Sequence, residues 1–195
     1  MKFFFISMLF LCGCSGISGK LLIIEANYRF NKENYTDSIY SYIKALENAE
    51  TAPYAEYGLG TLYYTIGEDE AALGRFTDAL ELIKDSPPYQ HQNLRYSINY
   101  NTGLVLFNMG DFSGAVASFR QALLTDGGKI EAKRNLELSL LSLEREKSLN
   151  AALEEEQNTE ENEGGAAMFD YIRQKELNQW RSTEWQEEEE TGPDY

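Results

Sequence analysis

The chain has 195 residues and a formal net charge of −15 at pH 7, so its length allows one domain with extensions at its ends. Eleven of its acidic residues lie in two runs, over residues 154–165 and 187–195, and neither run holds a basic residue. Runs of this kind are typical of solvated tails. The rest of the chain is mildly acidic and does not concentrate Lys and Arg as nucleic-acid binding requires.

The chain begins with the pattern of an export signal. One lysine precedes an apolar run from Phe3 to Leu11, which is shorter than the roughly 20 residues of a membrane-spanning helix and suits a secretory signal. Residues 11–14, Leu-Cys-Gly-Cys, resemble the bacterial lipobox, whose last cysteine is acylated. The resemblance implies a signal peptide over residues 1–13, a lipid on Cys14 and a short tether to residue 19. The alternatives are an uncleaved membrane anchor and a translation start assigned at the wrong position.

A pattern between Tyr57 and Leu80 returns 43 positions later and, more faintly, 34 positions earlier. Its small residues would let two helices of a hairpin approach closely, and its aromatic residue would pack the second helix on the next hairpin. The matched positions are Gly60, Gly67, Ala72, Phe76 and Ala79, then Gly103, Gly110, Ala115, Phe119 and Ala122, and in the earliest copy Ala26, Ser38, Tyr42 and Ala45. Gly67 and Gly110 are expected to end helices because glycine adopts the left-handed conformation readily. Glu33 stands at this place in the earliest copy.

A period of 34 residues is typical of tetratricopeptide repeats (TPRs), and residues 20 to about 148 resemble that family. The resemblance implies an all-α solenoid of about three helix-turn-helix repeats, a TPR domain over residues 20–149, whose last helix, Lys129–Ser148, caps the third repeat. Nine extra residues around Ser86–His91 form either a longer loop or an earlier start of the next helix. His91, the chain's single histidine, is expected to be an exposed loop residue rather than a metal ligand or a base.

The end of the chain changes composition twice. Residues 150–166 hold Glu, Gln, Asn and Gly with almost nothing to bury, which predicts a disordered acidic linker. Residues 167–186 regain aromatic content and helical periodicity, which predicts an amphipathic helix, and residues 187–195 form a second disordered acidic segment. The residues of this helix expected to bind a partner are Phe169, Ile172, Leu177 and Trp180, which share one broad face, and Trp185. An amphipathic helix of this kind is suited to bind in a groove of a partner protein. The alternatives are that it folds back on the repeats or lies on a membrane surface.

Catalysis is not expected. The sequence shows no Gly-rich phosphate loop, no histidine pair and no serine elbow, and its glutamates lie in runs rather than at facing positions. We therefore expect neither a cofactor nor a metal, and favour a binding function.

In TPR proteins the first helix of each repeat lines a concave groove, so the resemblance implies a peptide-binding groove. The groove residues are Tyr54, Tyr57, Thr61 and Tyr64 of the second repeat, and Ser97, Tyr100, Asn101, Leu104, Phe107 and Asn108 of the third. Two or three of these are expected to pack between helices instead. Aromatic and small polar side chains favour an extended or helical segment.

Some TPR proteins grip a C-terminal carboxylate with basic residues and asparagines at fixed positions. The corresponding positions here hold Ile23, Asn27, Gly58, Ser97 and Asn101. Two asparagines remain and every basic residue is absent, so a receptor for chaperone tails is not expected.

A second resemblance rests on the end of the domain. The helix IEAKRNLELSLLSLE, the acidic linker and the segment MFDYIRQKELNQW are similar to Bat-type TPR proteins of bacterial aerotolerance operons. This implies a non-catalytic scaffold, held by its lipid on the periplasmic side of the bacterial envelope. Its partners would be von Willebrand factor A-domain membrane proteins and a MoxR-type ATPase, with no nucleic acid or small-molecule substrate. The alternatives are an outer-membrane assembly lipoprotein and an envelope enzyme with an unrecognised site.

Overall fold

The computed structural model describes residues 18–190, and the side chains of residues 157–163 and 179–190 lie outside that description. The described residues form helices and turns without strands, which confirms the all-α prediction. They divide into two units, one ending at Leu143 and the other beginning at Glu144. The predicted signal peptide and Cys14 lie outside the described residues.

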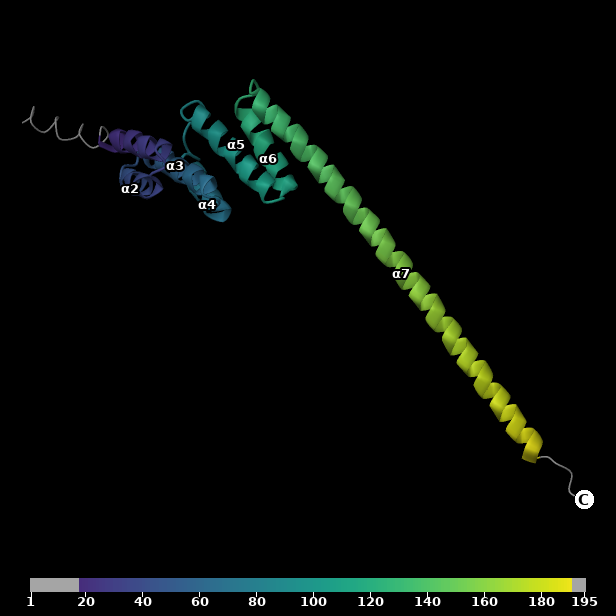
Figure 1. The fold of residues 1–195 in the computed structure, drawn as a ribbon. Helices are drawn as coiled ribbons and strands as arrows, with labels where there is room; N and C mark the ends of the chain where they lie inside the picture. Colours follow the sequence, from purple (N-terminus) through teal and green to yellow (C-terminus); the bar gives the residue numbers. More distant parts are fainter. Residues whose placement is uncertain (1–17, 191–195) are drawn as a thin grey trace, which may run out of the picture. The chain divides into compact units, whose positions relative to one another are not determined.

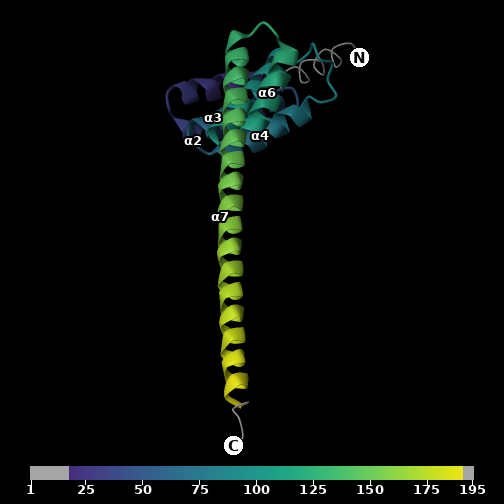
Figure 2. The ribbon, with the colours of Figure 1, turned by 90° about the vertical axis from the view of Figure 1, so that its right-hand side faces the viewer.

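The first unit is a series of helix hairpins, which confirms the three predicted repeats. The helix over residues 18–31 pairs with α2, α3 pairs with α4, and α5 pairs with α6 (Figures 1 and 2). The labelled helices are α2 (Tyr35–Ala45), α3 (Ala52–Thr65), α4 (Asp69–Leu82), α5 (Gln92–Asn108), α6 (Phe112–Thr125) and α7 (Ile130–Glu190).

Within a hairpin, the aromatic residue of the second helix lies against the glycine of the first. A Cβ atom built on Gly60 would come within 2.5 Å of the Phe76 ring, and one built on Gly103 within 2.7 Å of the Phe119 ring. Any larger residue at either glycine would therefore force the two helices apart. This confirms that the recurring small residues allow the helices to approach closely.

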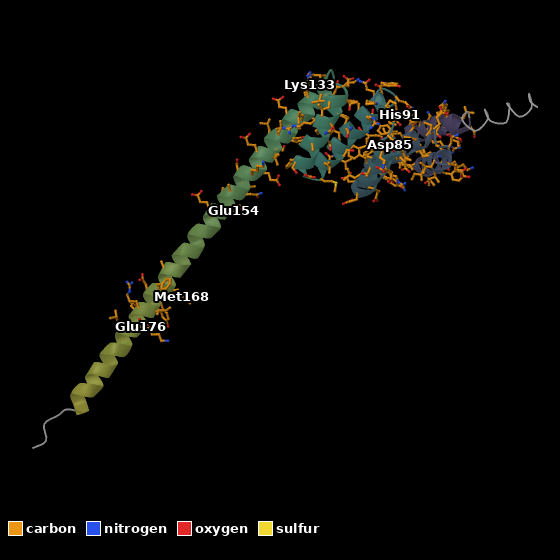
Figure 3. The ribbon with its side chains drawn as sticks, turned by 180° about the vertical axis from the view of Figure 1, so that it is seen from behind. Asp85, His91, Lys133, Glu154, Met168 and Glu176 are labelled. Carbon is orange, nitrogen blue, oxygen red and sulfur yellow. The ribbon has the colours of Figure 1, made fainter. Side chains whose placement is uncertain are left out.

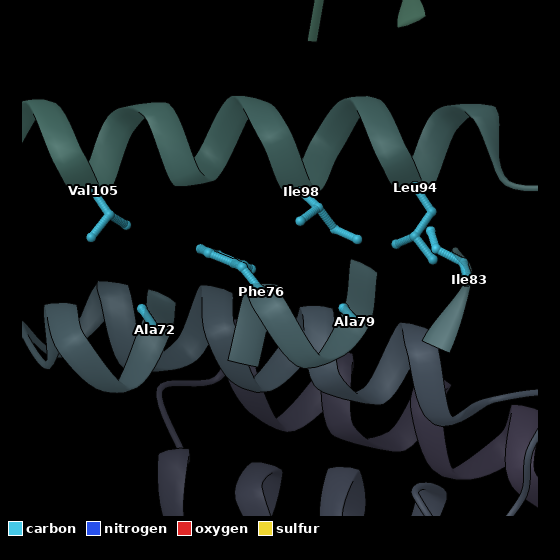
Figure 4. Close-up of a cluster of buried hydrophobic side chains, with 7 residues drawn as sticks. All are labelled: Ala72, Phe76, Ala79, Ile83, Leu94, Ile98 and Val105. Carbon is cyan, nitrogen blue, oxygen red and sulfur yellow. The ribbon is translucent and has the colours of Figure 1, made fainter. Parts of the chain in front are cut away.

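Between hairpins, the second helix of one repeat packs on the first helix of the next. Figure 4 shows this interface for the second and third repeats, where side chains from α4 and the turn after it face side chains of α5. The cluster consists of Ala72, Phe76, Ala79 and Ile83 on one side and Leu94, Ile98 and Val105 on the other. Burial of this apolar surface drives the stacking of one repeat on the next.

The turns inside the three hairpins share one backbone motif. Glu33, Gly67 and Gly110 have φ angles of 59°, 83° and 84°, all in the left-handed region. The next residue closes the motif by donating its N–H to the carbonyl five residues earlier, in the bonds Asn34 to Arg29 (3.0 Å), Glu68 to Tyr63 (2.9 Å) and Asp111 to Leu106 (2.9 Å). This arrangement is the Schellman motif, which favours glycine at the left-handed position. Gly67 and Gly110 therefore end their helices as predicted.

Glu33 occupies the left-handed position at an energetic cost that Gly67 and Gly110 avoid. Since this conformation costs a non-glycine residue about 1–2 kcal/mol, we expect Glu33→Gly to raise the free energy of unfolding by up to about 1 kcal/mol, the rest being offset by the added freedom of the unfolded chain. Gly67→Ala is the matched reversal, because a Cβ there would meet nothing within 4 Å. It should lower stability by about 1 kcal/mol. Urea denaturation measures both changes in the free energy of unfolding. Changes of the same sign in the two variants would contradict the explanation by left-handed backbone strain.

The extra residues between the second and third repeats contribute to both a loop and a helix. Helix α4 ends at Leu82, and α5 begins at Gln92, three positions before the place that matches the start of α3. The Arg95 guanidinium donates hydrogen bonds to the carbonyl oxygens of Ile83 and Ser86. The Ile83 carbonyl also accepts the backbone N–H of Ser86 at 3.1 Å, so Arg95 of α5 adds to the bonds that hold the turn after α4.

Helix α7 differs from the prediction for the end of the chain. Residues 150–166 were expected to form a disordered linker, but in the structure they belong to α7, as do residues 167–186. A helix satisfies its own backbone hydrogen bonds, and Glu, Gln and Ala are good helix formers, so a lack of apolar residues to bury does not prevent one. None of the described helices has an apolar stretch long enough to cross a membrane.

Candidate peptide-binding groove

An uncharged pocket of about 240 Å³ lies where the first and second repeats meet. Helix 18–31 and α3 supply most of its wall, and α2 supplies one tyrosine. Its lining residues are Ile23, Asn27, Phe30, Tyr42, Tyr54, Tyr57, Gly58 and Thr61. Three of them, Tyr54, Tyr57 and Thr61, belong to the predicted groove. The wall is largely aromatic with a few hydrogen-bonding groups, which suits an apolar side chain of a bound segment.

A second pocket of about 520 Å³ shares Ile23 and Tyr54 with the first, so the two pockets adjoin, and we call it the polar pocket because charged and polar side chains contribute to its wall. Its other lining residues are Lys20, Ile24, Glu50, Thr51, Gln90 and His91. Lys20 Nζ and Glu50 Oε1 form an ion pair at 2.6 Å. The groove is therefore uncharged and aromatic in one pocket and contains a charged pair in the other.

His91 helps to build the polar pocket rather than projecting from a loop, which corrects the prediction made for it. It is half-buried and immediately precedes α5. Its Nδ1 lies 3.3 Å from the Tyr54 hydroxyl, and the two rings meet edge to face with centroids 6.0 Å apart. Figure 3 labels His91 and Asp85, both of which belong to the first unit. In the described part of the chain, no three His, Cys, Asp or Glu side chains come together as a metal site.

Hydrogen bonds from asparagine to tyrosine connect the first helices of successive repeats. Asparagine Nδ2 groups donate to tyrosine hydroxyls from Asn101 to Tyr57 (3.1 Å), from Asn108 to Tyr64 (2.7 Å) and from Asn135 to Tyr100 (3.0 Å). Each tyrosine accepts in its bond, so its own O–H proton remains to be donated. These bonds fix the tyrosine rings and leave hydroxyl donors for a ligand.

Inside the uncharged pocket, Tyr42 donates its hydroxyl to Asn27 Oδ1 at 2.5 Å. Burial, with a smaller contribution from nearby Tyr57, raises the pKa of Tyr42 to about 12, so the hydroxyl keeps its proton at neutral pH. The bond leaves the Asn27 amide N–H groups as donors, since no partner for them occurs among the described side chains. The pocket therefore offers donors that suit the carbonyl oxygens of a peptide.

Four of the ten predicted groove residues pack against neighbouring helices, and one of these four, Tyr57, also lines the uncharged pocket. Tyr57 lies 5.9 Å from Phe76, Tyr100 lies 5.7 Å from Phe119 and Phe107 lies 5.2 Å from Phe112, measured between ring centroids. Tyr64 packs at the edge of the cluster between α4 and α5.

The predicted residues of α5 line neither pocket. Those not already described as packed are Ser97, Asn101, Leu104 and Asn108, of which Asn108 is exposed and the others are half-buried. The prediction missed the contribution of the first repeat instead. Lys20, Ile23 and Asn27 stand 34 positions before Tyr54, Tyr57 and Thr61, so the repeat period itself held the signal.

The positions that grip a carboxylate in some TPR proteins have another role here. Ile23, Asn27 and Gly58 line the uncharged pocket, and Asn101 is bonded to Tyr57. Among the lining residues of that pocket there is neither Lys nor Arg, so it offers no ion pair to a carboxylate.

The predicted partner-binding residues of the tail lie on α7 within the second unit. Phe169, Ile172 and Leu177 are 73%, 43% and 55% exposed, and Met168 and Glu176 of the same segment are marked in Figure 3. The side chains of Trp180 and Trp185 lie outside the described residues. The three described side chains are accessible, and their role as a partner-binding face stays a prediction.

Stacked helix hairpins with a groove along their first helices define a helical repeat protein, and the fold is that of a TPR domain. The first TPR of Spaghetti (RPAP3) bound to the HSP90 peptide SRMEEVD aligns with 65% of this chain and 93% of its own, at 16% identity and a TM-score of 0.56. The Sgt2 TPR domain from Aspergillus fumigatus aligns with 67% of this chain and 82% of its own, at 22% identity and a TM-score of 0.57. The crystal structure of MamA aligns with 68% of this chain and 81% of its own, at 21% identity and a TM-score of 0.53. No protein-family model and no curated protein matches the sequence.

Proposed function

We propose that the protein is a non-catalytic scaffold that binds a segment of a partner protein in the groove between helix 18–31 and α3. The observation that carries this proposal is the uncharged pocket, with its aromatic walls and the N–H and O–H donors of Asn27 and Tyr57. A partner segment would place an uncharged, bulky side chain in the pocket and its backbone carbonyls on these donors. The solved RPAP3 domain supports peptide binding by this fold, since its title names a bound HSP90 peptide.

The chemistry of the pocket favours a different ligand from that acidic peptide. SRMEEVD carries several carboxylates, and a neutral pocket of about 240 Å³ would have to desolvate any carboxylate it took without an ion-pair partner, which is costly. A leucine- or phenylalanine-sized side chain fits the apolar walls without that cost. We therefore expect selection for apolar or aromatic side chains over acidic ones.

The finer part of the proposal rests on the sequence. A lipid on Cys14 would hold the scaffold at the bacterial envelope, and the resemblance to Bat-type proteins would make its partners von Willebrand factor A-domain membrane proteins and a MoxR-type ATPase. The exposed apolar residues of the tail would form a second contact with such partners. The alternative is a lipoprotein that takes part in outer-membrane assembly, which the same lipobox-like sequence would anchor.

In-cell photocrosslinking from α3 tests this function. A photoreactive phenylalanine analogue replaces Thr61, which lines the uncharged pocket, or Thr65, which lies one turn later on the same helix and is exposed. We expect crosslinks to A-domain membrane proteins from position 61 and not from 65. Barrel-assembly proteins captured from position 61 would replace the proposed partners with the alternative.

A charge placed in the pocket provides the second arm of the test. Thr61→Lys would bring an ammonium group into the uncharged pocket, and should reduce crosslinking from a photoreactive analogue at Tyr54 at least tenfold. Thr65→Lys is the control, and should leave that crosslinking unchanged. Equal capture with and without the pocket charge, or no capture from position 61, would overturn the groove as the binding site.

A further inference from the structure

The first helix of each repeat carries two apolar positions, seven residues apart, that face the preceding repeat. In the second and third repeats these positions hold Ala55 and Leu62, and Ile98 and Val105, and all four side chains are 0% exposed. The second helix of the preceding repeat covers them, α2 over the first pair and α4 over the second. Burial at these positions is therefore how one repeat attaches to the one before it.

The first repeat has large apolar residues at the same two positions, and none of the described helices lies on them. Leu21 and Tyr28 stand 34 residues before Ala55 and Leu62, and they are 60% and 63% exposed. Ile24, which is also 63% exposed, lies between them on the same helix face because of its spacing of three and four residues. We call Leu21, Ile24 and Tyr28 the N-terminal stripe.

An exposed stripe of this kind is unusual at the end of a repeat array. Terminal repeats carry a polar outer face when nothing packs on them, because an apolar end would make the array insoluble. The equivalent positions on α7 hold Ala132 and Ser139, and both side chains are 0% exposed, so among the described repeats these positions are exposed in the first alone. The N-terminal stripe thus keeps the apolar character of an interface between repeats, and contiguous exposed apolar surface marks interaction sites.

We propose that the N-terminal stripe is a docking surface for an amphipathic helix of a partner protein, bound where a preceding repeat would place its second helix. The repeats themselves indicate the chemistry of that helix. Each second helix presents a small residue, an aromatic residue four positions later and an alanine three positions after that, as in Ser38, Tyr42 and Ala45, in Ala72, Phe76 and Ala79, and in Ala115, Phe119 and Ala122. All nine of these side chains are at most 2% exposed.

This surface differs from the uncharged pocket, although both use helix 18–31. The uncharged pocket is lined by Ile23, Asn27 and Phe30 of that helix. None of these residues belongs to the N-terminal stripe, although Ile24 of the stripe also lines the polar pocket. A helix on the stripe and a segment in the uncharged pocket could therefore bind together. The inference stands on the comparison between repeats and does not depend on the proposed function of the groove.

The chain supplies a probe of the required chemistry in its own α4. A fluorescently labelled peptide of residues 69–85 carries the pattern of Ala72, Phe76 and Ala79, and its binding to the full chain can be followed by anisotropy. A control peptide with Phe76→Ser keeps the length and charge but lacks the aromatic side chain. We expect saturable binding of the first peptide and at least tenfold weaker binding of the control.

Variants of the stripe decide where the peptide binds. Leu21→Ser and Tyr28→Ser change exposed side chains, so the fold should persist, and together they should weaken binding at least tenfold. Leu82→Ser is the matched control, because Leu82 is 53% exposed on another repeat, and it should leave binding unchanged. Circular dichroism on each variant verifies that the fold is retained.

Three results would overturn the proposal. The first is no binding of the α4 peptide, or equal binding by the double variant Leu21→Ser/Tyr28→Ser. The second is binding of the full chain to phosphatidylglycerol vesicles that this double variant abolishes, which would assign the stripe to a lipid surface. The third is a concentration-dependent dimer that the same double variant abolishes, which would assign the stripe to a second copy of the chain.

Discussion

Replacement of Phe76 by alanine is expected to lower the free energy of unfolding by about 3–5 kcal/mol, the range found when a buried aromatic side chain is truncated in a core. The ring is 1% exposed. It lies against Gly60 within its own hairpin and belongs to the cluster that joins α4 to Ile98 and Val105 of α5. The loss therefore weakens both the hairpin and its attachment to the next repeat.

Urea denaturation followed by circular dichroism at 222 nm measures this effect. Thr77→Ala is the control on the neighbouring residue, which is exposed and donates its hydroxyl to the Leu73 carbonyl. It should change stability by no more than about 0.5 kcal/mol. Because repeat arrays can unfold in parts, a broadened transition in the Phe76→Ala variant would also agree with a weakened interface. A loss below about 1 kcal/mol would contradict a central role for this ring.

The repeat period allowed much of the fold to be predicted from the sequence. The matched small residues, aromatic residues and alanines occupy equivalent places because each repeat has the same packing requirement, in which a ring must fit against a small residue of the first helix. The left-handed turns at Gly67 and Gly110 followed from the same comparison. The period did not extend to residues 150–166, where composition alone had to decide between linker and helix. There composition favoured a linker, whereas α7 continues through these residues, since helix formation needs no apolar burial.

The candidate site was predicted less well because it depends on contacts between repeats. The ten proposed residues came from the second and third repeats, whereas the pocket lies between the first and second. The bonds from Asn101 to Tyr57 and from Asn135 to Tyr100 join residues 44 and 35 positions apart, and no single repeat contains such a pair. Their one visible signal is that Asn101 and Asn135 stand 34 positions apart, at the same place in successive repeats.

Replacement of Gly103 by alanine should destabilise the protein by about 1–3 kcal/mol, the usual cost of overpacking a well-packed interior. The new Cβ atom would lie 2.7–2.8 Å from three atoms of the Phe119 ring, closer than van der Waals contact permits. In the interior of a helix, alanine normally stabilises by roughly 0.5–1 kcal/mol relative to glycine. A loss therefore shows that the close approach of α5 and α6 outweighs helix propensity.

Gly74→Ala is the control that isolates propensity, because Gly74 lies exposed within α4 and a Cβ there would meet nothing within 4 Å. It should stabilise the protein by about 0.5–1 kcal/mol, so the two glycine-to-alanine changes are expected to have opposite signs. If the ring causes the loss, adding Phe119→Leu to Gly103→Ala should cost less than the sum of the two single changes. If the stability losses of the two single changes simply add up in the double variant, the contact between residue 103 and the ring at 119 does not cause the loss. Gly103 would then not be the residue that sets the separation of α5 and α6.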